Sequence, residues 1–100
     1  MKTIDVLVAR VYVMESSHLL KEIINYLNDE LHIRGVSVFR AIQGIGDSGK
    51  HAMNVLDLAL DLPLTIEFFD DEVKVKQGID YLNQFIKPEH ILFWKAKTNA

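Results

Sequence analysis

The segment from Ile4 to Met14 reads IDVLVARVYVM and sets the fold of the 100-residue chain around it. Its many β-branched residues and short length predict a strand rather than a helix. Both alternating faces are apolar: one carries Val6, Val8, Tyr12 and Arg10, and the other carries Leu7, Ala9, Val11 and Val13. A strand with two apolar faces is expected at the centre of a sheet that is covered on both sides.

A helix is predicted directly after this strand, with Ser16 or Ser17 as its N-cap. The helix has an apolar stripe at three- and four-residue spacing, which is typical of a helix that packs on a sheet. The stripe consists of Leu20, Ile23, Ile24, Leu27 and Leu31. Arg34 and Gly35 are expected to end this helix, with Gly35 as the left-handed cap.

The rest of the chain predicts two more strands, a second helix and a last strand. The second strand is expected over residues 36–43 and the third over 64–69, after the strand-entry signal at Pro63. Asp70, Asp71 and Glu72 are acids suited to the N-terminus of the second helix, and Pro88 blocks its continuation before a last strand over 91–96. The buried stripe of this helix is expected to be Val75, Ile79, Leu82 and Ile86. The pattern over residues 52–59 is ambiguous between a short helix and a strand, and we expect a mobile excursion in which local helix can form.

This element order, strand–helix–strand twice, predicts an α+β fold of the ferredoxin-like βαββαβ type. Such a sandwich has an antiparallel four-stranded sheet with two helices on one face. The other face of the sheet is expected to be covered as well, because the first strand is apolar on both sides. Another copy of the chain is the simplest cover, so we expect a homo-oligomer. Arg10 and Arg40 lie on apolar strands, where a cation needs a carboxylate or a ligand. Glu67 on the third strand is an available partner, and structural pairing is the expected role.

Composition excludes several classes of partner. The net charge of −3 offers no basic field for nucleic acid or an anionic membrane surface. No apolar run approaches the roughly 20 residues of a spanning helix, so the protein is not expected to be membrane-embedded. The chain has no cysteine, which removes disulfides and thiolate sites and fits a cytoplasmic location. We expect one domain over residues 1–100.

The segment from Gly44 to His51 holds three of the five glycines of the chain. It contains the dinucleotide spacing G-x-G-x-x-G and, from Gly44 to Lys50, a near P-loop with histidine in place of the magnesium-binding hydroxyl. Both motifs belong to parallel α/β sheets, which the predicted element order does not provide. An ordinary glycine-rich connection between strands stays open as well. The candidate ligand-binding residues are Arg40, Gly44, Gly46, Gly49, Lys50 and His51.

Catalytic and metal sites are not indicated by the sequence. The four histidines have no H-E-x-x-H or other two-ligand helical spacing. No G-x-S-x-G motif occurs, and Glu15 with His18 fits turn and cap chemistry better than acid–base catalysis. We therefore expect no catalytic residue and no metal site within one chain, and no cofactor can be assigned.

The residues from Gly35 to Gly46, then Gly49, His51 and the segment 61–67, resemble the PII-like proteins of unknown function. This branch is related to the PII nitrogen-regulatory signal transducers. The resemblance implies a ferredoxin-like fold, a trimer whose sheets face the three-fold axis, and no established enzymatic activity. In signalling PII proteins, a Gly-Phe-Gly motif opens a flexible loop that contacts partners, and nucleotides bind between subunits near its base. Gly44, Ile45 and Gly46 occupy that motif here, so a flexible loop over about residues 45–60 is expected.

Two departures from the PII pattern affect the functional expectation. The glycine-rich, basic segment that holds nucleotide phosphates is replaced by residues 85–90, and the loop has no tyrosine that could be uridylylated. The leading hypothesis is a non-enzymatic sensing module: a small anionic ligand, with nucleotides as one class, binds between subunits and acts through the loop on a partner protein. The alternatives are a phosphate-handling enzyme built on the near P-loop, and a structural or metal-bridging trimer related to divalent-ion tolerance proteins.

Overall fold

The computed structural model describes residues 1–46, 49–52 and 62–100, with side chains for 1–45 and 62–100. Within this part of the chain, two α-helices and six strands follow one another. They are β1 (Thr3–Met14), α1 (Leu20–Asn25), β2 (Gly35–Arg40), β3 (Gln43–Gly46), β4 (Gly49–Ala52), β5 (Pro63–Asp70), α2 (Glu72–Leu82) and β6 (Ile91–Asn99). A π-helical turn, Tyr26–Glu30, continues α1.

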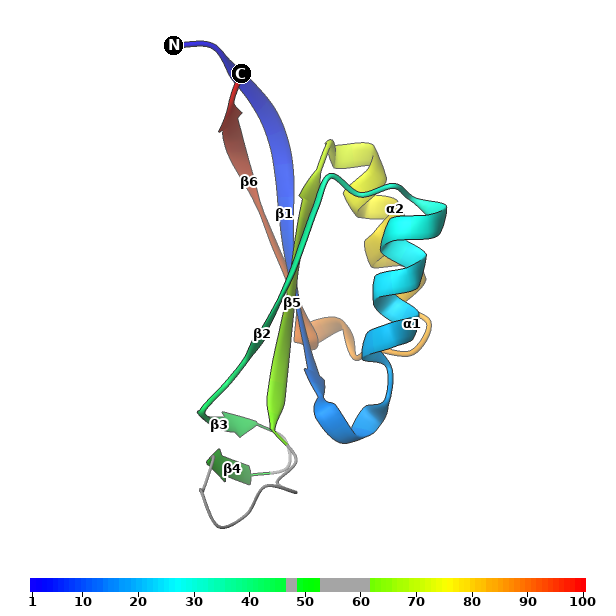
Figure 1. Cartoon of the computed structure of the whole chain (residues 1–100), viewed down its shortest axis with the longest axis vertical. Coiled ribbons are helices and arrows are strands. Elements are labelled where there is room, and N and C mark those ends of the chain that lie inside the picture. Colours follow the sequence, from blue (N-terminus) through cyan, green and yellow to red (C-terminus); the bar gives the residue numbers. More distant parts are fainter. Residues whose placement is uncertain (47–48, 53–61) are drawn as a thin grey trace.

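Strand β1 lies inside a four-stranded sheet with the order β2-β5-β1-β6, and every neighbouring pair is antiparallel. Both helices cover the same face of this sheet, and the β3–β4 hairpin lies at the end opposite the two termini (Figure 1). The predicted ferredoxin-like fold and the central position of the first strand are therefore confirmed.

The inner face of the sheet forms the core with the apolar stripes of the helices. Residues of β1 on this face are almost fully buried, as are their neighbours on β5 and the helices, because each supplies apolar surface to the same layer. The most completely buried residues are Ala9, Val11, Ile23, Leu27, Ile66, Phe68, Val75 and Leu82. The stripes predicted for the two helices thus face the sheet.

The outer face of the sheet carries large apolar side chains that no helix covers. Directly paired residues share a face, and the register places Val8 beside Trp94, Arg10 beside Leu92, and Thr65 between Tyr12 and Phe39. The exposed apolar residues of this face are Ile4, Tyr12, Phe39, Leu92 and Trp94. A contiguous exposed apolar surface of this kind is typical of an interaction face.

A cation lies among these apolar residues with its charge satisfied. Arg10 Nε donates a hydrogen bond to Glu67 Oε1 at 2.8 Å, and its guanidinium lies 5.2 Å from the ring centre of Trp94. The ion pair and the cation–π contact keep the arginine in place on an apolar surface. Of the two arginines expected to pair structurally, Arg10 thus pairs with Glu67, whereas Arg40 pairs with Glu15.

The ends of the first helix differ from the prediction. The helix begins at Leu20 with Leu19 as its N-cap and without a side-chain cap, so the assignment of Ser16 or Ser17 was wrong. Ser17 Oγ instead accepts from the Leu19 N–H at 3.3 Å and donates to the Met14 carbonyl at 2.7 Å, which stabilises the turn after β1.

The left-handed residue after this helix is His32, with φ of 52°, and not Gly35 as predicted. Gly35 is the first residue of β2, opposite Phe69 of β5. An added Cβ at Gly35 would lie 2.2 Å from the Phe69 ring, so close packing is the reason for glycine here.

The predicted second strand is divided into two. Strand β2 ends at Arg40, and β3 then pairs with β4 as a hairpin in which Gly44 lies opposite His51 and Gly46 opposite Gly49. Residues 45, 46 and 49–52 of the expected loop thus belong to this hairpin. Of residues 52–59, expected as a mobile excursion with local helix, Ala52 is the last residue of β4 and residues 53–59 lie outside the described residues.

Asp70 is the one buried charged residue among the described side chains. Burial by itself raises the pKa of this carboxyl, but hydrogen bonds from the Asp71 and Arg34 backbone N–H groups, both 2.7 Å long, lower it below its ordinary value of 3.8. Lys74 and Arg34 add favourable charge. The carboxylate therefore links the ends of β5, the segment before β2, and α2.

We predict that Asp70→Asn lowers the free energy of unfolding by about 2 kcal/mol at pH 7, because it removes charge-assisted hydrogen bonds. The pKa of Asp70 is lower in the folded protein than its ordinary value of 3.8. The stabilisation by this carboxylate is therefore complete above pH 3.8 and is lost as pH falls through the pKa of the folded state. Urea unfolding of both proteins against pH should show the difference shrinking on acidification. Asp80→Asn, on an exposed position of α2, is the control; a pH-independent difference for Asp70→Asn would contradict the assignment.

Candidate functional site

A cavity of about 830 Å³ lies where β1 ends and the β3–β4 hairpin begins. Its walls come from the end of β1, the turn after it, the start of β3, the start of β5, and the segment between α2 and β6. Segments far apart in the sequence therefore meet at one end of the sheet (Figure 1).

The cavity exists because β6 is displaced along β1. Strand β6 pairs with β1 only from Thr3 to Val11, so Tyr12, Val13 and Met14 extend past the last β6 partner. Pro88 starts a 3₁₀ turn, Pro88–His90, that delays the start of β6 until Ile91. The connection from Phe85 to His90 then borders the cavity where a longer β6 would have paired.

The lining combines an apolar part with polar groups, as small-molecule sites commonly do. The apolar side chains include Met14, Leu19, Phe85 and Ile86, and the hydroxyl groups come from Tyr12, Ser17 and Thr65. Ionisable groups are contributed by Lys87, Glu89 and His90. Lys87 can donate a charge-assisted hydrogen bond to an anion, His90 offers ring nitrogens, and Glu89 adds one carboxylate to the same lining. The cavity therefore combines an apolar wall with polar groups of both signs.

The predicted ligand-binding residues are only partly brought together. Gly44 lines the cavity, next to Pro63, whose Cγ would lie 3.1 Å from an added Cβ at Gly44. Arg40 does not line the cavity; its Nη2 donates to Glu15 Oε1 instead. The β3–β4 hairpin contains Gly46, Gly49, Lys50 and His51. The side chains of Lys50 and His51 lie outside the described part of the structure.

Lys87, Glu89 and His90 were missed as site residues from the sequence. The segment from Phe85 to His90 was interpreted as the loss of a phosphate-holding element, because it has no glycine. The available signal was the position of a lysine and a histidine around Pro88, immediately before the last strand. Only the structure shows that this segment faces Gly44 across one cavity.

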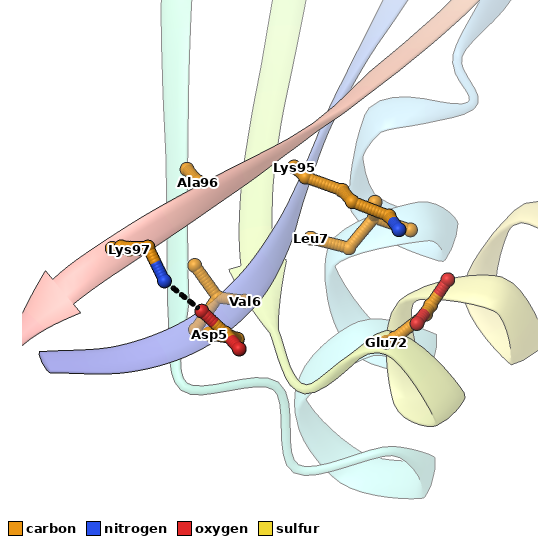
Figure 2. Close-up of a pocket in the computed structure, with 7 residues that line it drawn as sticks. All are labelled: Asp5, Val6, Leu7, Glu72, Lys95, Ala96 and Lys97. Carbon is orange, nitrogen blue, oxygen red and sulfur yellow. Dashed lines mark hydrogen bonds and ion pairs between the residues drawn. The ribbon is translucent and has the colours of Figure 1, made fainter.

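A second hollow, of about 310 Å³, lies near the other end of the sheet beside the start of α2. Its lining includes the buried residues Val6 and Leu7, and Lys97 Nζ donates to Asp5 Oδ1 at 2.5 Å beside them. Figure 2 shows the Lys95 side chain extending toward Glu72. The rim therefore carries equal numbers of acids and lysines, and hydrogen bonding from Lys97 lowers the pKa of Asp5.

The residues that the structure describes hold neither a candidate metal site nor a candidate membrane-spanning helix. There, no three or more histidine, aspartate or glutamate side chains gather as a metal-binding group would require. No described helix has the length and apolar character needed to cross a membrane.

Comparison with known proteins connects this fold to one family and to several solved structures. The family model described as DUF190 (Uncharacterized ACR, COG1993) matches residues 1–98. CPII from Thiomonas intermedia K12, solved with ADP and bicarbonate, is 14% identical with a TM-score of 0.76, over 99% of this chain and 93% of that chain. It is described as a nitrogen regulatory PII-like protein.

Two other structures share the fold at lower similarity. A protein from Thermus thermophilus classed as a PII-like signalling protein is 13% identical with a TM-score of 0.67, over 98% of this chain and 91% of that chain. CutA1 from Oryza sativa is 10% identical with a TM-score of 0.63, over 98% and 84% of the two chains. The resemblance to PII-like proteins that the sequence predicted is confirmed.

Proposed function

The chain belongs to the DUF190 family, and from that premise we propose that it is a non-enzymatic sensing module that binds a small anionic ligand. The observation that carries the proposal is that Gly44, Lys87 and His90 line a single cavity with an apolar wall. Glycine leaves a backbone accessible to a ligand, the lysine supplies a positive charge, and the histidine supplies a ring nitrogen that can hydrogen-bond.

Nucleotides are the ligand class to test first. CPII from Thiomonas intermedia K12, which has this fold, was solved with ADP and bicarbonate. The cavity offers Phe85 and Tyr12 as aromatic surface for a base, and Lys87 as a partner for phosphate. Gly46, Gly49, Lys50 and His51 are proposed to extend the site from the hairpin, and no resident cofactor is assigned.

The ligand is proposed to act through the segment around residues 45–60 on a partner protein in the cytoplasm. The hairpin is hydrogen-bonded as β3 and β4, and Gly44 of β3 lines the cavity. A ligand that contacts Gly44 can therefore favour one arrangement of the hairpin over another, which is how binding shifts a conformational equilibrium. The single domain over residues 1–100 carries both the cavity and this segment.

The proposed assembly is a homotrimer in which the outer faces of the sheets meet. The apolar residues Tyr12, Phe39, Leu92 and Trp94 are more than a third exposed on that face, and their burial would stabilise association. Tyr12 also lines the cavity, so assembly through this face would bring a neighbouring subunit to the ligand site.

The phosphate-handling enzyme is a weaker candidate. A P-loop requires a helix that begins at its lysine. Here Lys50 lies in β4, opposite Ile45 of β3. A structural or metal-bridging trimer is favoured only by the similarity to CutA1, which shows the fold alone.

Titration of the wild-type protein with ADP is expected to raise its melting temperature and to give a measurable heat of binding, because a ligand of the native state stabilises it. We predict that Lys87→Gln weakens ADP binding about tenfold, the loss of one charge-assisted hydrogen bond. Lys76→Gln, an exposed lysine of α2, is the matched control. Equal affinity of Lys87→Gln and wild type would contradict the assignment, and steady release of inorganic phosphate from ATP would favour the enzyme.

Light scattering is expected to give the mass of three 11.5 kDa chains at micromolar concentration. We predict that Phe39→Glu shifts this mass toward one chain, because a carboxylate on the outer face cannot be buried without a partner. Val73→Glu, which is 68% exposed on α2 and away from that face, should keep the trimer. A wild-type mass of one chain would contradict the assembly.

A further inference from the structure

Arg40 and Glu15 form an ion pair at the edge of the cavity without lining it. Arg40 is the last residue of β2, and Glu15 follows directly after β1. Strand β5 lies between these two strands in the sheet, so the pair crosses over β5. Arg40 is opposite Leu64 on β5, and Leu64 is opposite Val13 on β1, which places the pair on the inner face of the sheet.

Two backbone hydrogen bonds connect the same three segments beneath the ion pair. The Glu15 N–H donates to the Leu62 carbonyl at 3.0 Å, and the Ala41 N–H donates to the Pro63 carbonyl at 3.0 Å. Leu62 and Leu64 are 3% and 4% exposed. The end of β1, the end of β2 and the start of β5 are therefore joined by main-chain hydrogen bonds, and the side chains of Arg40 and Glu15 add an ion pair between the first two.

The neighbours of the paired residues are cavity walls. Ala41 follows Arg40 and Met14 precedes Glu15, and both line the cavity, as does Pro63 between them. A displacement of Arg40 or Glu15 would thus also displace the neighbouring wall residue, Ala41 or Met14. Arg40 and Glu15 remain about half and two-fifths exposed, with side-chain exposures of 51% and 38%, so the pair can open without unfolding the core.

We propose that Arg40 and Glu15 act together as positioning residues that hold the two cavity walls in register, so that the pair rather than the Arg40 charge sets ligand affinity. This inference rests on the proposed function, since it concerns the same cavity. It replaces direct contact of Arg40 with the anion, which was the role expected from the sequence. The two roles predict opposite effects of removing the Glu15 carboxylate on ligand affinity. If Arg40 contacts the anion directly, the change frees Arg40 and strengthens binding. If the pair positions the walls, the change weakens binding.

The test measures ADP affinity calorimetrically for Glu15→Gln, Arg40→Gln and the exchanged pair Glu15→Arg with Arg40→Glu. Each single variant is expected to bind ADP about fivefold more weakly, and the exchanged pair is expected to recover most of the loss. The controls are Glu72→Gln and Lys76→Gln, which break an exposed ion pair of α2 with an Nζ–Oε1 distance of 3.0 Å. They should leave the affinity unchanged.

Unchanged or tighter binding by Glu15→Gln would overturn the inference, and so would an exchanged pair as weak as Arg40→Gln, because each result shows that the ion pair does not set ADP affinity. Hydrogen exchange of the Ala41 amide in the ligand-free protein gives a second readout. It should be faster in both single variants, and slow again in the exchanged pair. If the wild-type protein binds no ADP, the proposed function fails; the Ala41 exchange then decides whether the pair positions the walls, and unchanged rates would overturn it.

Discussion

The apolar character of both faces of β1 is the constraint on which the rest of the structure depends. Its inner residues, such as Ala9 and Val11, are completely buried by the two helices. On its outer face Val6 is buried, but Tyr12 is 38% exposed, because a single sheet layer provides no second cover there. The central position of β1, the two helices on one side and the apolar outer face all follow from this one segment.

The position of the cavity follows from a difference in strand length rather than from a sequence motif. β1 extends to Met14, whereas its pairing with β6 stops at Val11, because Pro88 and the turn after it delay the start of β6. The end of β1 is therefore lined by a connecting segment with a lysine and a histidine instead of by another strand. Polar groups reach an otherwise apolar region of the sheet in this way.

The fold was predictable from the sequence because periodicity reports burial, and burial determines the layers. The α1 stripe through Ile23 and Leu27, and the parity of β1, were sufficient to derive the sheet and its helices. The helix ends were less predictable. Glycine at position 35 is required by close packing against the Phe69 ring and not by a left-handed turn, and this contact joins residues that are distant in the sequence. Of the residues predicted to bind a ligand, Gly44 lines the cavity, Arg40 is held by Glu15, and the side chains of Lys50 and His51 lie outside the described residues. Lys87 and His90 reach the same cavity through tertiary packing, which the sequence does not show.

In the trimer proposed above, the apolar outer face would also couple the stability of this protein to its own concentration. A chain whose sheet gains a cover by association is stabilised by mass action, so its melting temperature would depend on how much protein is present. Newly made chains at low concentration would expose Phe39, Leu92 and Trp94 together, and such a surface invites non-specific association before the correct contacts form. In that assembly the central strand that organises the fold would also set a lower limit on the concentration at which the fold is stable.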